Sequence, residues 1–179
     1  MKTVTQFCTL LTLILVISCS STQSLQEYYV DSAENPNFIS LDLPASILNL
    51  EEANLSDTQK EAIQSLKKLN VLAFRKTATN AAEYEIEKGK VTAIFKNSSF
   101  KELMKLNSSY GKGFIKYSGE EDAINEVIIY GNSNDKGFAL VRVLGNDMNP
   151  AHLVQLMQAI QQSDYKGEGL GEIGEFLKG

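Results

Sequence analysis

The sequence has few of the residues from which metal and catalytic centres are built. Its 179 residues include two cysteines, Cys8 and Cys19, and a single histidine, His152. A structural zinc site takes four Cys or His ligands, and both thiols have another explanation, given below. No Gly-x-Ser-x-Gly elbow presents a serine to His152, so we predict that His152 is a solvated residue of the last helix. We therefore expect no metal, no cofactor and no catalytic residue.

Arginine is equally scarce. Arg75 and Arg142 are the only two, and 17 basic against 22 acidic residues give a formal net charge of -5. This balance argues against a nucleic-acid partner. Arg142 alternates with Leu140 and Leu144 in a predicted strand, where its charge needs a carboxylate. We predict a structural ion pair there, with anion binding as the alternative.

The N-terminal segment has the parts of a secretory signal peptide. One charge, Lys2, precedes an apolar run over residues 7–17, which is shorter than the ~20 residues that span a bilayer. The run ends in Val16-Ile17-Ser18-Cys19, which resembles the bacterial lipobox, whose cysteine is acylated before cleavage. We predict a signal peptide over residues 1–18 and a lipidated tether over 19–23.

Lipidation of Cys19 would make the membrane a partner of this chain. Several acyl chains bind a bilayer firmly, whereas one myristoyl chain binds marginally. No Asp follows Cys19, which favours the outer membrane of the bacterial cell envelope, with the domain facing the periplasm. Because Cys8 leaves with the signal peptide, the mature domain has no disulfide and depends on core packing.

Residues 24–163 are predicted to form one α+β domain, with a mixed sheet, an antiparallel meander in its C-terminal half, and helices packed on one face. Ser24 with Glu27, and Ser56 with Gln59, are capping boxes that predict two helices. The second helix carries an apolar stripe of Ala62, Ile63, Leu66 and Leu69. Strands are predicted at residues 37–43, 71–75, 103–106, 113–117, 124–130 and 138–144, and a last helix follows Asn149-Pro150.

Residues 79–96 fit two patterns. Glu83-Tyr-Glu-Ile-Glu87 alternates as a strand does, and residues 88–90 could turn a hairpin. Read with a helical period, Ala82, Ile86, Ala93 and Ile94 form a poorer stripe, and Gly89 would cost ~1 kcal/mol inside it. The pattern alone slightly favours the hairpin.

The order of these segments is similar to that of a known family. After the lipobox come NVLAFRK, SFKELMKL and GFALVRVLG, and then the final helix. Over residues 24–162 the chain resembles the uncharacterised Bacteroidetes lipoproteins grouped as domain of unknown function 4252. The resemblance implies a helix at residues 79–96, and this is the assignment that we follow. It implies no activity and no catalytic residue.

The C-terminal tail, residues 164–179, is rich in Gly and Glu, and we predict that it is flexible. It contains a G-x-G-x-x-G match at residues 169–174, but this match lacks the strand, helix and acid of a dinucleotide site. The alternative is that the tail folds when it binds a partner. The possible contacts with that partner are Leu170, Ile173, Phe176 and Leu177.

Acidic residues gather at two places. Glu83, Glu85 and Glu87 form one group and residues 120–122 the other. Two carboxylates about 5–10 Å apart serve glycosidases, and several oxygens bind calcium. Neither group has the spacing of a calcium loop, so we predict solvated positions for both.

These observations favour a non-catalytic binding or regulatory module with an envelope protein as its possible partner. An envelope hydrolase using paired carboxylates, and a carrier of a small apolar ligand, are the alternatives. The sheet face that the helices leave uncovered is the first surface to suspect. Exposure of Tyr110, Phe114 or Tyr117 on that face would indicate an interaction patch.

Overall fold

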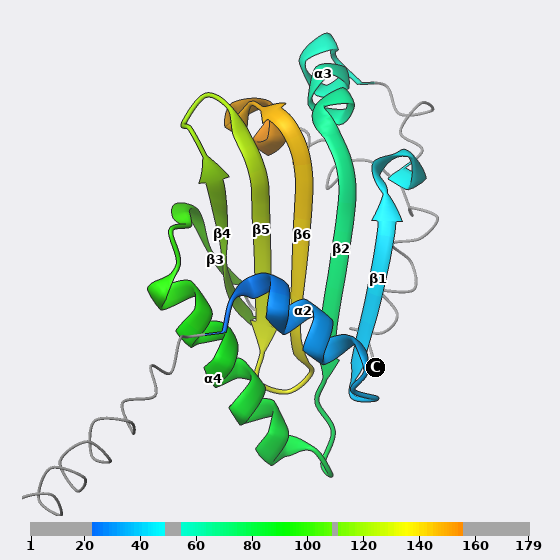
Figure 1. Cartoon of the computed structure of the whole chain (residues 1–179), viewed down its shortest axis with the longest axis vertical. Coiled ribbons are helices and arrows are strands. Elements are labelled where there is room, and N and C mark those ends of the chain that lie inside the picture. The colour runs from blue at the N-terminus through cyan, green and yellow to red at the C-terminus, as the bar shows by residue number, and fades with distance from the viewer. Residues whose placement is uncertain (1–22, 49–54, 109–110, 156–179) are drawn as a thin grey trace, which may run out of the picture.

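The computed structural model describes residues 23–48, 55–108 and 111–155. They form one six-stranded sheet in the order β1-β2-β6-β5-β4-β3, with helices at both of its faces (Figure 1). The elements are α2 (Leu25–Ala33), β1 (Phe38–Pro44), η1 (Ala45–Leu48), α3 (Asp57–Ser65), β2 (Leu66–Arg75), α4 (Ala81–Asn97), β3 (Lys101–Ser108), β4 (Gly111–Gly119), β5 (Ile124–Ser133) and β6 (Gly137–Met148). Residues 150–155 are helical as well.

The α+β class and the C-terminal antiparallel meander are confirmed. The four meander strands pair in sequence order, and β2 pairs antiparallel with both β1 and β6. Each pairing between described strands is thus antiparallel, whereas we expected a mixed sheet. The reason is the crossover through α4, which carries the chain from β2 to the far edge of the sheet, so that β2 and β3 are not neighbours.

Both capping boxes are present. The Ser24 hydroxyl accepts from the backbone N–H of Glu27 at 3.2 Å, and the Glu27 carboxylate accepts from the N–H of Ser24 at 2.8 Å. Ser56 and Gln59 repeat the arrangement at the start of α3. The predicted extension of that helix through Leu69 is wrong, because the chain enters β2 at residue 66, where both neighbouring strands pair with it.

Residues 81–97 form one helix, α4, as the family resemblance implied. Its buried face consists of Tyr84, Glu87, Val91, Ile94 and Phe95, which follow a helical period. The sequence pattern hid this face because one of its members is a glutamate and because the apolar Ile86 points to solvent, with 60% of its surface exposed.

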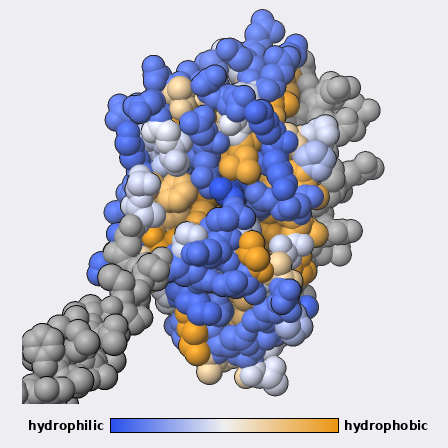
Figure 2. Space-filling view, in the orientation of Figure 1, coloured by the Kyte–Doolittle hydropathy of each residue, from blue (hydrophilic) through white to orange (hydrophobic). Residues whose placement is uncertain are grey.

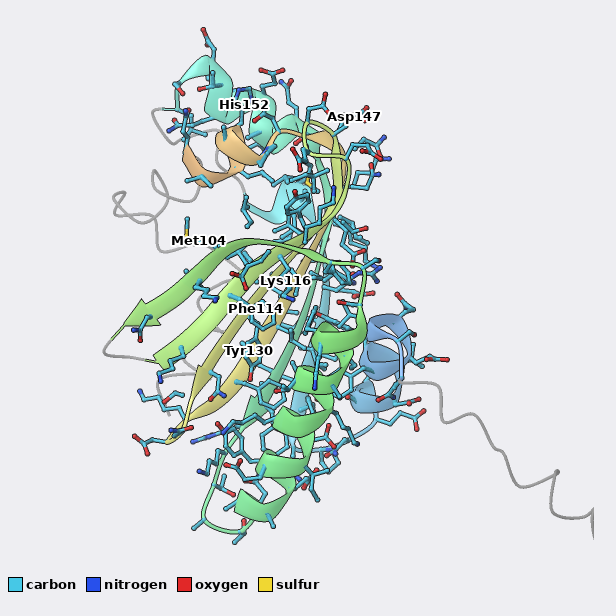
Figure 3. All side chains as sticks on the ribbon, turned by 90° about the vertical axis from the view of Figure 1, so that its left-hand side faces the viewer. Met104, Phe114, Lys116, Tyr130, Asp147 and His152 are labelled. Atoms are coloured by element: carbon cyan, nitrogen blue, oxygen red, sulfur yellow. The ribbon has the colours of Figure 1, made fainter. Side chains whose placement is uncertain are left out.

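Two apolar clusters lie on opposite faces of the sheet. On the face that we call face A, α2 and α4 pack over the aromatic residues of β1, β2, β5 and β6, as expected of helices on one face. Residues of η1, α3 and the helical segment 150–155 instead join the cluster on the other face, face B, together with Leu69, Ile115 and Val143. In Figure 3 the labelled Phe114, Lys116 and Tyr130 lie on the α4 side of the sheet.

The two helices on face A do not cover all of it. In Figure 1 they cross the lower half of the sheet, and the strands continue beyond them. Figure 2 shows that the surface above α2 is hollowed, with hydrophilic and hydrophobic residues side by side. Among the helices of the described residues, none is both long and apolar enough to cross a membrane.

Candidate functional site

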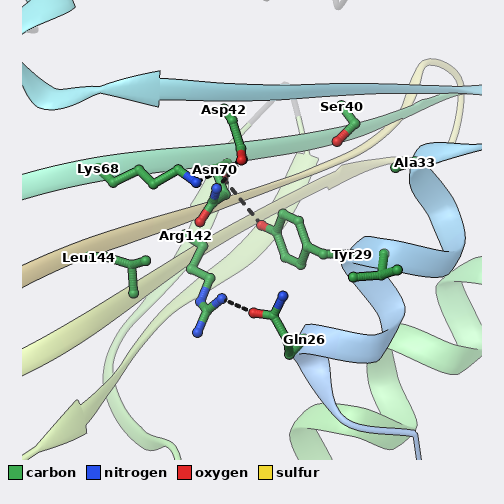
Figure 4. Close-up of a pocket in the computed structure, with 10 residues that line it drawn as sticks. Gln26, Tyr29, Ala33, Ser40, Asp42, Lys68, Asn70, Arg142 and Leu144 are labelled. Atoms are coloured by element: carbon green, nitrogen blue, oxygen red, sulfur yellow. Dashed lines mark hydrogen bonds and ion pairs between the residues drawn. The ribbon is translucent and has the colours of Figure 1, made fainter.

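A pocket of about 290 Å3 lies where α2 meets the uncovered part of face A. One wall is α2, and strands β1, β2 and β6 form the rest (Figure 4). The residues that line it are Gln26, Tyr29, Val30, Ala33, Ser40, Asp42, Lys68, Asn70, Arg142 and Leu144. It holds about ten water-sized volumes, at ~30 Å3 for each water. That size suits a small ligand or the side chains of a peptide.

Strand register brings three of these residues into one row across the sheet. Asp42 pairs with Asn70, and Asn70 pairs with Arg142. Side chains alternate between the two faces of a sheet, so residues two and four positions along each strand from this row point to the same face as the row. The row therefore lies on face A, beside the aromatic core. Face A therefore changes from aromatic beneath the helices to charged and polar beyond them.

Two ion pairs occupy this polar part of face A. The Lys68 ammonium lies 2.7 Å from the carboxylate of Asp42, which also accepts a hydrogen bond from the Asn70 amide. The guanidinium of Arg142 donates through Nε to Glu126 and through Nη1 to Gln26, the latter at 2.5 Å. The predicted structural ion pair of Arg142 is confirmed. The pair is more shielded than the first, with 18% and 14% of its side chains exposed.

Tyr29 closes the bottom of the pocket. Its ring points from α2 toward the sheet, as Figure 4 shows, and its hydroxyl lies 3.2 Å from the carbonyl oxygen of Leu140 and 3.4 Å from that of Asn70. Burial raises the pKa of Tyr29, and the positive charge of Arg142 works against this shift. A neutral phenol thus joins α2 to two central strands, which fixes the position of the helical wall.

Asp42 gives a first prediction, for the pH dependence of the pocket. The hydrogen bond from Lys68 holds the pKa of Asp42 below its ordinary value of 3.8, and the Asn70 amide adds to this effect. Since the folded pKa is the lower one, Asp42 contributes stability above about pH 3.8 and loses that contribution as the pH falls through its folded pKa. A carboxyl NMR titration of Lys68→Gln should show the pKa of Asp42 rising toward 3.8, and an unchanged pKa would contradict the assignment.

The charges in the pocket fit binding better than acid–base chemistry. A paired-carboxylate hydrolase needs a general acid with a raised pKa. Asp42 is the carboxylate in the lining, and its pKa is lowered. The lining is also too polar for a carrier of a purely apolar ligand.

The acidic groups seen in the sequence have mainly structural partners. Glu83 accepts hydrogen bonds from the amides of Asn35 and Asn37 at 2.7 and 2.8 Å. Glu87 is buried between α4 and α2, so its predicted solvated position is wrong. Burial is possible there because the Tyr28 hydroxyl and the Lys90 ammonium donate to its carboxylate. Residues 120–122 are exposed between β4 and β5, as predicted.

His152 lies at the contact between the last helix and α3. Its side chain is 23% exposed, and Nδ1 is 3.7 Å from the carboxylate of Glu61. It is therefore less solvated than we expected, because α3 packs beside it. Within the described ranges, no three His, Cys, Asp or Glu side chains gather as a metal site would require.

The described aromatic residues do not form the interaction patch that exposure of Tyr110, Phe114 or Tyr117 would have indicated. Phe114 is half-buried against the cluster of face A, and Tyr117 is buried in the cluster of face B. Tyr110 lies outside the described residues, as do Cys19 and the tail residues Leu170, Ile173, Phe176 and Leu177.

Sequence reasoning found Arg142 but missed the pocket around it. A usable signal was present, because Ser40 alternates with Asp42 and Lys68 with Asn70 in apolar strands. Polar residues at alternate positions of a strand mark a stretch whose face is not covered. Which strands lie side by side was the missing information.

The comparisons with known proteins identify a family. The sequence model of a family described as "Domain of unknown function (DUF4252)" matches residues 28–156. The matched range contains each residue of the pocket lining except Gln26. No curated protein and no solved structure matches the chain.

Proposed function

The chain belongs to the DUF4252 family, whose description names no activity, and from this premise we propose that it is a lipid-anchored module of the bacterial cell envelope that binds a partner or ligand without catalysing a reaction. In this proposal Cys19 carries the lipid, and the domain faces the periplasm from the outer membrane. The pocket between α2 and face A is the binding site.

The observation that carries the proposal is the way in which the pocket is built. Its charged side chains are held by partners: Lys68 by Asp42, and Arg142 by Glu126 and Gln26. Groups that are held in place before a ligand arrives lose less entropy when it binds. The pocket also lies in the hollow that the face A helices leave open (Figure 2).

The proposed anchor would keep this pocket near the membrane. Helix α2 begins at Leu25, six residues after Cys19, and Gln26 in its first turn lines the pocket. A fully extended chain covers at most ~3.3–3.6 Å per residue, so the start of α2 would lie within about 20 Å of the lipidated cysteine. Ligands or proteins at the membrane surface are then within reach. The tail residues Leu170, Ile173, Phe176 and Leu177 are a proposed second contact with a protein partner.

The proposed anchor has a direct test in cells. A palmitate analogue fed to growing cells should label the wild-type chain, and the label should be absent from Cys19→Ala. The variant should also leave the membrane fraction. Labelling that persists in Cys19→Ala would contradict the lipidation site.

The proposed binding surface can be tested by photo-crosslinking in cells. A photoreactive amino acid at Val30, which lies at the rim of the pocket and is 61% exposed, should give an adduct with an envelope component. The same amino acid at Ile86, which is 60% exposed on α4, is the matched control. Adducts from Ile86 alone, or from neither site, would exclude the pocket as the binding surface.

Removal of residues 166–179 separates the two proposed contacts. An adduct at Val30 that survives the truncation places the ligand in the pocket alone. An adduct that is lost assigns the tail a part in holding a protein partner.

A further inference from the structure

We infer that the pocket binds a small amphiphile with one anionic head group, a carboxylate or a phosphate. The head group lies between Lys68 and Arg142, and the apolar body lies along Val30 and Ala33 of α2; Figure 4 shows Ala33 on the far side of Tyr29 from Lys68 and Arg142. This inference rests on the proposed binding function and narrows the class of ligand.

The first support is the order of charges across face A. The cations, Lys68 and Arg142, lie on the adjacent central strands β2 and β6, and their carboxylate partners lie on the outer neighbours β1 and β5. Of these four groups, Glu126 does not line the pocket. The four charges balance as two ion pairs, but the lining contains both cations and only one of the two carboxylates. A ligand in the pocket therefore meets more positive than negative groups, which favours an anion.

The hydrogen-bonding groups of the pocket also favour an anionic ligand. A guanidinium has five N–H donors, and the bonds that hold Arg142 use Nε and Nη1. The Lys68 ammonium has three donors, and its ion pair with Asp42 is half-exposed. Both oxygens of Asp42 already accept, one from Lys68 and one from Asn70. The pocket thus offers donors to an anion, while the carboxylate that a cation would need is engaged.

The apolar part of the lining indicates that the ligand also has an apolar body. Val30 is one of three large hydrophobic residues exposed in the described part of the chain, with 61% of its surface open. Ala33 follows it after three residues, on the same side of α2, and Leu144 belongs to the sheet wall. A volume of about 290 Å3 is about ten times the ~30 Å3 that one water takes in the liquid. A head group with a short apolar chain fits a volume of this order.

The test is calorimetric titration of the purified full chain with three probes of matched size. Octanoate and butyl phosphate carry the two candidate head groups, and octylammonium carries the opposite charge. We expect both or one of the anions to bind, and the one that binds identifies the head group. Hexanoate should bind about fifteenfold more weakly than octanoate, because it has two methylenes fewer and each buried methylene changes affinity about fourfold. Binding of octylammonium as tight as that of octanoate would overturn the inference.

Variants of the head-group site should move the affinity in opposite directions. Lys68→Gln removes a charged donor and should weaken binding of the anion about tenfold or more. Asp42→Asn removes the competing carboxylate and should tighten it. Lys60→Gln removes an equally charged lysine from an exposed ion pair on α3 and should change nothing. An unchanged affinity in Lys68→Gln, with circular dichroism showing an intact fold, would overturn the inference.

The apolar contact has its own variant. Val30→Ser should weaken octanoate several-fold and leave the affinity for acetate unchanged. Equal losses for both anions would contradict the placement of the apolar body.

These outcomes separate the inference from the proposed function. A Val30 adduct in cells without binding of either anion would overturn the ligand class and leave the binding module standing. Binding of an anion that Lys68→Gln weakens, without palmitate labelling in cells, would overturn the proposed anchor and leave the inference intact.

Discussion

Replacement of Phe138 by alanine is expected to lower the free energy of unfolding by about 3–5 kcal/mol, the usual cost of removing a buried aromatic ring. Phe138 is 1% exposed and lies at the centre of the aromatic cluster of face A. Its ring stacks on Phe74 at a centroid distance of 5.7 Å and contacts three further aromatic rings, those of Phe38, Tyr84 and Tyr130. Alanine would leave a cavity among aromatic side chains from one helix, α4, and three strands, β1, β2 and β5.

Urea denaturation of the variant and the wild type measures this loss. For a chain of this size, 1 kcal/mol corresponds to ~2–4 °C in Tm, so the melting temperature should fall by roughly 6–20 °C. Ile86→Ala is the matched control, because Ile86 is 60% exposed and its truncation should cost little. A loss in Phe138→Ala no greater than in the control would show that the aromatic cluster of face A does not contribute to stability as its burial implies.

The local features of the fold were predictable from the sequence. Each capping box needs only residues three apart, and the first turns of α2 and α3 form as those residues predict. The four meander strands also follow from alternation and from turn residues near them. Such features depend on interactions between residues that are a few positions apart, so they can be predicted directly from the sequence.

Helix α4 shows where periodicity alone fails. Its buried face includes Glu87, which a hydrophobic pattern counts as solvated, and its apolar Ile86 faces solvent. The glutamate is tolerated inside because Tyr28, 59 positions away, donates to it. That partner depends on how α2 and α4 cross on face A, which no local pattern contains. The helix was predicted from the family resemblance and not from the hydrophobic pattern of the residues.

The pocket could not be predicted for a similar reason. Arg142 and Gln26 are 116 residues apart, and Lys68 and Asp42 are 26 apart. Lys68 and Asp42 meet because β1 pairs with β2, and Arg142 lies beside them because β6, the last strand of the meander, also pairs with β2. The chemical character of each residue could be read from the sequence, but the strand order that brings these residues together could not be predicted from it.

Helix α2 links the pocket to the core through two adjacent tyrosines. Tyr29 reaches the backbone of the central strands beneath the pocket, while Tyr28 reaches Glu87 on α4. The helical wall that carries Gln26 and Val30 is therefore held from both sides. A change on α4, far from the pocket, should loosen that wall without altering any residue that lines it.

The pair formed by Tyr28 and Glu87 gives the second large effect. The Tyr28 hydroxyl donates to Glu87 at 2.9 Å, and Tyr28 is 1% exposed. In Glu87→Ala the buried hydroxyl loses its acceptor, which should cost about 1–3 kcal/mol, the penalty of a buried polar group left unsatisfied. Burial also raises the pKa of Tyr28 above its ordinary value of 10, and the negative charge of Glu87 adds to the shift. The phenol therefore remains a donor at neutral pH. Its contribution is fully present below about pH 10 and is lost as the pH rises through the higher folded pKa.

A double-mutant cycle separates the hydrogen bond from the packing around it. Tyr28→Phe keeps the ring and removes the donor, and Tyr28→Phe with Glu87→Ala removes both partners. Because neither change then leaves a buried group unpaired, the double variant should be more stable than the sum of the single losses predicts, by about 0.5–3 kcal/mol. Additive losses would show that the two side chains are not coupled. If the two side chains are coupled, Glu87→Ala should also weaken octanoate binding, because the wall that carries Val30 would lose one of its two attachments. Lys88→Gln on the same helix is the control and should leave octanoate binding unchanged.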